Sequence, residues 1–168
     1  MKALHRIALP TLASTAMLLL ATGSTVAQTL KQQIVGAWQV ISVINEKDGK
    51  KTEQFGPNPL GLFIFTADGH FSTGIVRPGR PKFASKSRDT GTPEENKASV
   101  EGTIATFGTY TVNETDKAVE VHIVGSSFPN WDGSDQKRTV EITGDEMKYT
   151  NPTPSVGQRA LLMLKRAK

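Results

Sequence analysis

Short runs of alternating apolar and polar residues follow one another along most of the chain, separated by turn signals. The β-branched and aromatic content of these runs suits the pleated, half-buried surface of a sheet. Asp68-Gly69 lies between two of them and is a strong hairpin signal. The pattern predicts eight β-strands, at residues 34–45, 60–66, 70–76, 107–113, 118–124, 136–143, 146–150 and 159–166.

One helix is predicted in the long connection between the third and fourth of these strands. Thr92 suits its cap and Pro93 its first position, and acidic residues follow in the first turn. The helix would run to about Glu101, with Gly102 at its end. The preceding segment, 77–91, is polar, basic and rich in Pro and Gly. Connections of this length are usually functional or mobile.

Eight antiparallel strands joined mostly by short turns can close into a barrel, which leaves no exposed edge. We therefore expect an all-β fold, an eight-stranded antiparallel β-barrel with one short helix in a long connection. A β-sandwich is the main alternative. A barrel of eight strands is wide enough for one small ligand.

The first 27 residues follow a different pattern. Lys2 and Arg6 form a basic start, an apolar stretch covers 7–23, and Thr25-Val26-Ala27 places small residues where a signal peptidase reads. These are the three parts of a secretory signal peptide, which predicts cleavage after Ala27 and export to the periplasm or the medium.

A retained membrane anchor is the alternative for this segment. Pro10 and the Thr and Ser residues weaken a stable membrane span, so we expect no stable anchor once the signal is cleaved. The domain predicted to remain covers residues 28–168.

Charge and cysteine content narrow the function classes. The 168 residues include 20 Lys and Arg and 16 Asp and Glu, a net charge of +4. Removing the first 27 residues takes two basic and no acidic residues and leaves 141 residues with a net charge of +2. This is too little positive charge to indicate nucleic-acid binding. The absence of cysteine excludes disulfides, thiolate metal sites and a cysteine nucleophile.

Several sequence blocks resemble those of one protein family. Gly36-Ala37-Trp38, at the start of the first strand, resembles the Gly-x-Trp signature of lipocalins. Over about residues 34–166 the chain is similar to bacterial lipocalin-like domain proteins. The matching blocks are Gly36-Ala37-Trp38, Phe55-Gly56-Pro57 with Gly61-Leu62, Thr66-Ala67-Asp68-Gly69, 77–85, 91–95, Gly108-Thr109-Tyr110, His122, 126–133, Gln136 and Arg138.

The resemblance implies a lipocalin-like β-barrel, but no established ligand or reaction comes with it. It also implies structural roles for Gly36 and Trp38. In lipocalins the first-strand Trp closes the base of the barrel, and a basic residue of the last strand packs over it. Lys165 and Arg166 are the two candidates for that basic residue.

His122 receives two conflicting predictions. Strand alternation puts Val121 and Ile123 on the apolar face and His122 on the opposite, outer face. The resemblance favours an interior position, because His122 belongs to the family blocks that include Trp131 and Arg138. Both orientations stay open from the sequence.

No sequence motif supports a metal site or a hydrolase active site built from the histidines and acidic residues. His70 and His122 with Asp132 or Glu120 have the composition of a two-His, one-carboxylate metal site, but no His spacing supports it. A Ser-His-Asp hydrolase would need a nucleophile elbow, and Gly-x-Ser-x-Gly is absent. We expect no metal and no cofactor.

Five basic residues lie within 77–88, with no acid among them. A solvated loop is the simplest interpretation. The functional alternative is an electropositive rim in which Arg77 and Arg80 attract an anionic ligand.

We expect noncatalytic binding of a small, partly apolar and possibly anionic molecule inside the barrel. Its candidate ligand-binding residues are Tyr110, His122, Trp131, Arg138, Arg77 and Arg80.

Two alternatives remain. The first is an enzyme of the isomerase, cyclase or hydratase type acting on a small carbonyl compound, with His122 as acid–base group and Tyr110 or Arg138 stabilising negative charge. The second is an interaction module whose barrel is filled by its own side chains and which exposes an apolar patch.

Overall fold

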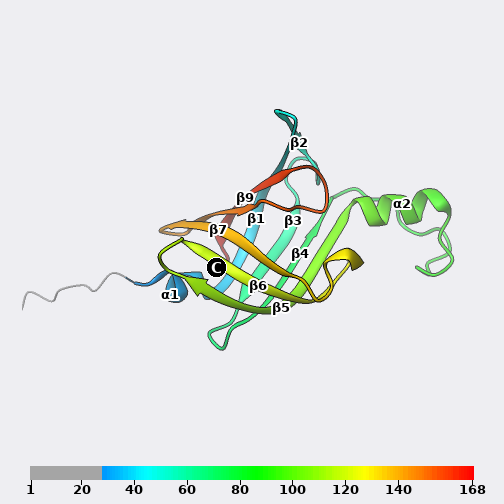
Figure 1. Cartoon of the computed structure of the whole chain (residues 1–168). Helices are drawn as coiled ribbons and strands as arrows, with labels where there is room; N and C mark the ends of the chain where they lie inside the picture. Colours follow the sequence, from blue (N-terminus) through cyan, green and yellow to red (C-terminus); the bar gives the residue numbers. More distant parts are fainter. Residues whose placement is uncertain (1–27) are drawn as a thin grey trace, which may run out of the picture.

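The structure is a computed structural model that describes residues 28–168. The predicted signal segment, 1–27, lies outside the described residues. Nine antiparallel strands and three short helices make up the fold (Figure 1). The strands are β1 (Gly36–Lys47), β2 (Lys50–Glu53), β3 (Leu60–Phe65), β4 (His70–Val76), β5 (Thr103–Asn113), β6 (Ala118–Ser126), β7 (Asp135–Thr143), β8 (Glu146–Asn151) and β9 (Arg159–Arg166); the helices are α1 (Leu30–Ile34), α2 (Pro93–Glu101) and the 3₁₀ helix η1 (Pro129–Trp131).

Eight of the strands close into a barrel. Each strand from β3 to β8 pairs with the next one along the chain, and β1 pairs with both β3 and β9. The extra strand, β2, pairs only with the end of β1, from Ile44 to Lys47. This closure confirms the eight-stranded antiparallel barrel and excludes the sandwich.

The strand predictions were right where apolar residues alternate and wrong where they do not. Residues 70–76 and 159–166 form strands with the predicted bounds. β5 begins at Thr103 rather than at residue 107, and β2 was missed because all four of its residues are exposed and polar. The predicted helix is confirmed as α2, with Thr92 as its cap.

A helical turn, α1, covers one end of the barrel. Its last residue, Ile34, is where the sequence predicted the first strand to begin. The indole nitrogen of Trp38 donates a 2.8 Å hydrogen bond to the carbonyl oxygen of Ile34, the last residue of α1. The carboxylate of Glu114, in the β5–β6 turn, accepts 2.9 Å hydrogen bonds from the backbone N–H groups of Leu30 and Lys31. These contacts make the α1 end the closed end of the barrel.

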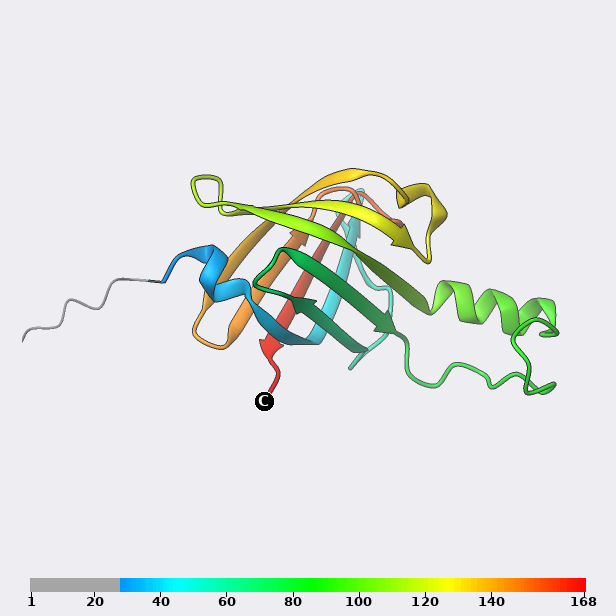
Figure 2. The ribbon, with the colours of Figure 1, turned by 90° about the horizontal axis from the view of Figure 1, so that it is seen from below.

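At the opposite end, segment 77–91 and α2 project away from the barrel as an arm (Figures 1 and 2). None of the residues of α2 is buried. A capping box at Thr92 and Glu95 holds the first turn of α2. The other oxygen of the Glu95 carboxylate accepts a hydrogen bond from the N–H of Ala84, so the helix and the segment before it are tied together.

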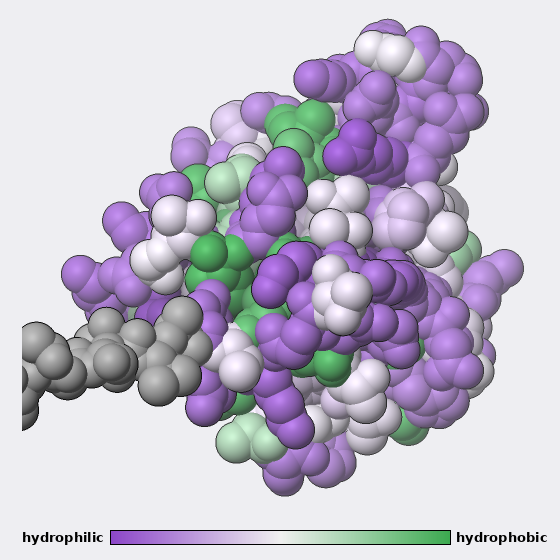
Figure 3. Space-filling view, turned by 60° about the vertical axis from the view of Figure 1, so that its left-hand side comes forward, coloured by the Kyte–Doolittle hydropathy of each residue, from purple (hydrophilic) through white to green (hydrophobic). Residues whose placement is uncertain are grey.

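The outer surface is largely polar. On the face that Figure 3 shows, hydrophilic residues predominate and hydrophobic residues gather in small patches. Most of the large apolar side chains of the barrel strands instead point inward, where Trp38, Phe65, Leu164 and their neighbours form one continuous core. Ile64 and Phe107 are among the exceptions that face outward. The helices of residues 28–168 include none that is both long and apolar enough to span a membrane.

Candidate functional site

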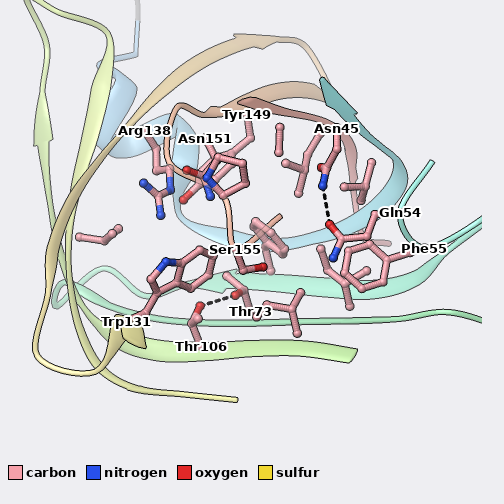
Figure 4. A pocket seen from close by; sticks show the side chains of 18 of the residues that line it. Asn45, Gln54, Phe55, Thr73, Thr106, Trp131, Arg138, Tyr149, Asn151 and Ser155 are labelled. Carbon is pink, nitrogen blue, oxygen red and sulfur yellow. Dashed lines mark hydrogen bonds between the residues drawn. The ribbon is translucent and has the colours of Figure 1, made fainter. Parts of the chain in front are cut away.

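A cavity of about 70 Å³ lies inside the barrel, toward the end opposite α1. Most of its wall is apolar, with Phe55, Phe63 and Phe71 among its aromatic side chains. The polar part of the wall includes Arg138, Tyr149, Asn151, Asn45, Gln54, Ser155, Thr73 and Thr106, and Trp131 lies across from Arg138 (Figure 4). The arrangement is an apolar cavity with a few polar anchors, which is the usual form of a small-molecule site.

Arg138 carries the positive charge of this cavity. Arg138 lies two residues before Val140 on β7, so both side chains face the inside of the barrel. Only 4% of the surface of Arg138 is exposed. Its guanidinium donates to the carbonyl oxygen of Lys137 at 3.1 Å and to the side-chain oxygen of Gln136. Burial lowers the pKa of Arg138, while the neighbouring hydroxyl of Tyr149 acts in the opposite direction.

The described residues around Arg138 supply no negative charge. None of its side-chain nitrogens lies within salt-bridge distance of a carboxylate in residues 28–168. The described part of the cavity wall also contains no Asp or Glu. A buried cation without a counter-charge is costly, and no side chain in the described wall offsets that cost.

Two aromatic side chains flank the guanidinium. The Arg138 Cζ atom lies 5.9 Å from the centre of the Trp131 ring, within the range of a cation–π contact. Trp131 belongs to η1, and the Phe128 ring contacts it edge-on. Tyr149 packs edge-on against Phe63, with ring centres 5.4 Å apart, and its burial raises the pKa of its hydroxyl, which therefore stays protonated near neutral pH.

Hydrogen-bonding groups line the rest of the polar wall. The hydroxyls of Thr73 and Thr106, on β4 and β5, lie 2.7 Å apart and bond to each other. The amide nitrogen of Asn45 donates to the side-chain oxygen of Gln54 and to the carbonyl oxygen of Val156. Asn45 therefore ties β1 to two segments at the mouth of the barrel, one after β2 and one between β8 and β9.

The structure places His122 outside the barrel, which corrects the interior position that the family resemblance favoured. Its side chain is 50% exposed, and its Nδ1 atom lies 2.8 Å from the carboxylate of Asp135. Val121 and Ile123 point inward on either side of it. His122 therefore has no place among the cavity's ligand-binding residues, and the acid–base constellation of His122, Tyr110 and Arg138 is not assembled.

Tyr110, predicted to bind ligand, is buried and does not line this cavity. Its hydroxyl donates a 2.7 Å hydrogen bond to the carbonyl oxygen of Thr66 in the β3–β4 turn, and its ring packs edge-on against Phe65. Burial, with a smaller contribution from the charge of Asp68, raises the pKa of Tyr110. Phe65 pairs with Gly36 at the start of β1, so this region belongs to the closed end.

Arg77 and Arg80 brace the base of the arm and do not line the cavity, contrary to the predicted electropositive rim. Arg77 donates a 2.5 Å hydrogen bond to the carbonyl oxygen of Gln54. Arg80 donates to the carbonyl oxygen of Arg77 and bonds the hydroxyl of Thr103. These three hydrogen bonds hold the loop segments at the base of the arm in place.

At the closed end, the structure assigns the contact over Trp38 to Arg166 rather than to Lys165. The Arg166 Cζ atom lies 4.1 Å from the centre of the Trp38 ring. Gly36 has a positive φ of 124°, and a Cβ atom there would lie 3.1 Å from Arg166 Nη1. The glycine thus leaves room for the guanidinium.

Within residues 28–168, no group of three or more His, Asp or Glu side chains is arranged to hold a metal ion. Sequence reasoning named Trp131 and Arg138, which the structure brings together in the cavity, and missed Asn45, Gln54 and Tyr149. Tyr149 lies two residues after inward-facing Met147 on β8, so strand alternation predicts its inward position from the sequence. Asn45 was not, because a β-bulge between Val40 and Ser42 changes which residues of β1 face inward.

Two comparisons with known proteins agree with this architecture. The 4'-hydroxy-3'-methoxypropiophenone carrier protein of Aspergillus oryzae is 32% identical to the chain over 92 residues, which are 51% of this chain and 82% of that protein. A family model of the lipocalin-like domain matches residues 35–166, from the first barrel strand to the last. The chain belongs to the lipocalin-like domain family.

Proposed function

We propose that the protein is a noncatalytic carrier that holds a small, partly apolar anion in its barrel. The observation that carries this proposal is Arg138, a buried cation that faces an apolar cavity with no acidic side chain in its described wall. An anionic ligand would supply the missing charge, and charge-assisted hydrogen bonds to a guanidinium are strong. The apolar wall would contribute affinity through burial of the rest of the ligand.

The size of the cavity limits the ligand. A dry cavity of about 150 Å³ holds benzene, whereas this one measures about 70 Å³. A single aromatic ring therefore needs a larger cavity than this one. The ligand is accordingly a small molecule.

The similar carrier protein supports the aromatic, oxygenated part of this ligand class and not its negative charge. Its name denotes a carrier of an aromatic ketone that bears hydroxyl and methoxy groups. A ring of that kind suits the Trp131 side of the cavity, and an electron-rich oxygen suits Arg138. We extend to this chain the class, a small oxygenated aromatic molecule, and not the individual compound.

The composition of the cavity wall favours binding over acid–base chemistry. The described lining residues include no His, Asp or Glu, which are the common general bases. The enzyme alternative relied on His122, whose side chain is on the outer surface. Binding alone requires only the anchors that the cavity has.

We further propose that the protein is exported and that its signal peptide is cleaved after Ala27. The sequence pattern of residues 1–27 supports this. The test is the denatured mass of protein exported by its own signal. Loss of residues 1–27 is expected, and a mass that retains them would refute cleavage. A native spectrum of the same sample would show a bound ligand as extra mass that denaturation removes.

The carrier proposal is tested by calorimetric titration with benzoate and with benzyl alcohol, which has a similar shape and no charge. We expect benzoate to bind at least tenfold more tightly, and Arg138→Met to remove that preference. His122→Ala, on the outer wall, is the matched control and should bind as wild type does. Equal binding of both compounds by wild type, or an unchanged preference in Arg138→Met, would refute the anchor.

A second candidate function is protein interaction through the outer face of the barrel. Ile64, Ser72 and Phe107 lie side by side on β3, β4 and β5, and Ile64 and Phe107 are exposed. Sedimentation of wild type and of Phe107→Ser tests this candidate. An oligomer of wild type that is absent in Phe107→Ser would support this candidate. If both proteins sediment as monomers at high concentration, the face mediates no self-association.

A further inference from the structure

The strand register puts Arg138 and Asn45 at the two ends of one polar row on the cavity wall. Asn151 on β8 pairs with Ala160 on β9, and Ala160 pairs with Asn45 on β1. Arg138 lies one residue before Thr139, the residue that pairs with Thr150. Three strand spacings of about 4.8 Å place the two ends of the row roughly 14 Å apart along the curved wall.

The row is polar at its ends and has a small side chain, Ala160, next to Asn45. Below it, toward the closed end, the next paired residues are Tyr149, Leu162 and Val43. A ligand that lies across this row therefore meets a cation at one end, an amide at the other and a mostly apolar floor.

The Asn45 amide has an orientation that its neighbours determine. Its nitrogen donates to the side-chain oxygen of Gln54 at 2.5 Å and to the backbone carbonyl oxygen of Val156 at 3.0 Å. A backbone carbonyl only accepts hydrogen bonds, so the nitrogen must face Val156. Both amide protons are then used, and the oxygen Oδ1 points away from these two partners.

Oδ1 of Asn45 is a buried acceptor without a hydrogen-bond partner among the described residues. Only 3% of the surface of Asn45 is exposed. Buried polar groups nearly always have a partner, and one that lacks it weakens the folded state. An unpaired acceptor at the edge of a cavity is available to accept a hydrogen bond from a ligand.

Two connecting segments form the mouth of the cavity next to Asn45. One contains Gln54 and Phe55, and the other runs from Asn151 to Ala160. The cavity of about 70 Å³ is smaller than one that holds a benzene ring. A ring that reaches Oδ1 therefore needs a larger cavity than this one.

We propose that Asn45 accepts a hydrogen bond from a hydroxyl or amino group of the ligand, at the end opposite the anionic group that Arg138 binds. This inference rests on the proposed carrier function and narrows its ligand class. The ligand is a small cyclic molecule with an oxyanion at one end and an O–H or N–H donor at the other.

The test compares 4-hydroxybenzoate with 4-methylbenzoate by calorimetric titration of the wild-type protein. The methyl group has nearly the size of the hydroxyl and lacks the proton. We expect 4-hydroxybenzoate to bind about fivefold more tightly, the effect of one net hydrogen bond. The result requires no variant, so it does not depend on whether a variant folds.

Two variants locate the effect. Asn45→Leu removes the acceptor and should make 4-methylbenzoate the tighter ligand. His122→Ala changes only the outer wall and should retain the preference for 4-hydroxybenzoate. Retention of the preference in a folded Asn45→Leu protein would overturn the proposal, as would its loss in His122→Ala.

Arg138→Met separates failure of this inference from failure of the carrier proposal. If wild type binds both benzoates equally and both weaken at least tenfold in Arg138→Met, the carrier proposal stands and the role of Asn45 is overturned. If neither benzoate binds wild type at millimolar concentration, both proposals are overturned.

Discussion

The barrel has an arginine against a tryptophan at each end, and the two pairs differ in how their guanidinium groups are used. At the closed end, Arg166 lies 4.1 Å from the Trp38 ring and donates to the carbonyl oxygens of Gln33 and Val35. Near the mouth, Arg138 lies 5.9 Å from the Trp131 ring and bonds only to groups of its own strand among the described residues.

The difference shows that the partners, and not the residue types, decide the role of such a pair. The bonds of Arg166 connect β9 to the turn that covers the base, and Asp145 lies 3.9 Å from its side chain. Trp38 is fully buried beneath it. Arg138 contacts Trp131 and Tyr149, but its hydrogen bonds to backbone carbonyls stay within β7, and no acid lies near it in residues 28–168. The first pair therefore stabilises the fold, whereas the second lies in the wall of the cavity.

The largest expected effect is a difference in unfolding free energy between variants of the two tryptophans. Trp38→Ala should lower the free energy of unfolding by about 3–5 kcal/mol, because it empties the base of the core. Trp131→Ala should cost about 1 kcal/mol, since its ring is partly exposed at the mouth, and should weaken ligand binding. Urea unfolding of both variants measures the comparison. Equal losses of stability would contradict the assignment of separate roles.

The closed-end arginine should contribute less than its tryptophan. Arg166→Met loses two hydrogen bonds to backbone carbonyls, so we expect a loss of about 2 kcal/mol. Lys165→Met is the matched control, because its exposed side chain points away from Trp38, and it should leave stability nearly unchanged. A midpoint of urea unfolding for Arg166→Met that equals that of the control would refute the structural role.

Acid should weaken the closed end through Glu114. Hydrogen bonds from the N–H groups of Lys31 and then Leu30 lower the pKa of Glu114 below its ordinary 4.5. The stability it adds is therefore fully present above pH 4.5 and is lost as the pH falls through the lowered value.

The melting temperature of wild type minus that of Glu114→Gln measures this contribution. The difference should be positive near neutral pH and shrink as the pH falls below 4.5. Glu120→Gln, an exposed outer residue of β6, is the control and should show no such trend. A constant difference for Glu114→Gln over this range would show that its charge does not hold α1.

The smallest effect is expected outside the barrel. His122→Ala removes a half-exposed side chain whose partner, Asp135, is itself exposed, so stability should change by less than about 0.5 kcal/mol. Binding of benzoate should not change. A tenfold loss of affinity in this variant would mean that the outer face of β6 takes part in the site.

Strand alternation alone predicted much of the barrel and part of its site. Arg138 falls in phase with Val140 and Ile142 on β7, so its inward position follows from the sequence. The same rule put His122 outside, which the structure bears out, and the family resemblance was the misleading signal there. Alternation is informative in these strands because each has one face buried.

The rest of the site was not predictable because it depends on irregular backbone. The bulge in β1 places Val43 and Asn45 inward after Trp38 and Val40, which no uninterrupted alternation allows. Gln54 and Ser155 come from connections between strands, where no period applies. Their positions follow from barrel closure, which brings the connections after β2 and β8 to the same mouth.

The most direct test of the account is the thermal stability of Arg138→Met with and without benzoate. Removing an uncompensated buried charge should leave the free protein within about 1 kcal/mol of wild type or make it more stable. Benzoate at 100 times its dissociation constant should stabilise wild type by about 2.7 kcal/mol and leave the variant unaffected. If Arg138→Met is instead destabilised as strongly as Arg166→Met, and benzoate stabilises neither wild type nor the variant, then Arg138 is a structural residue and the cavity is not the proposed carrier site.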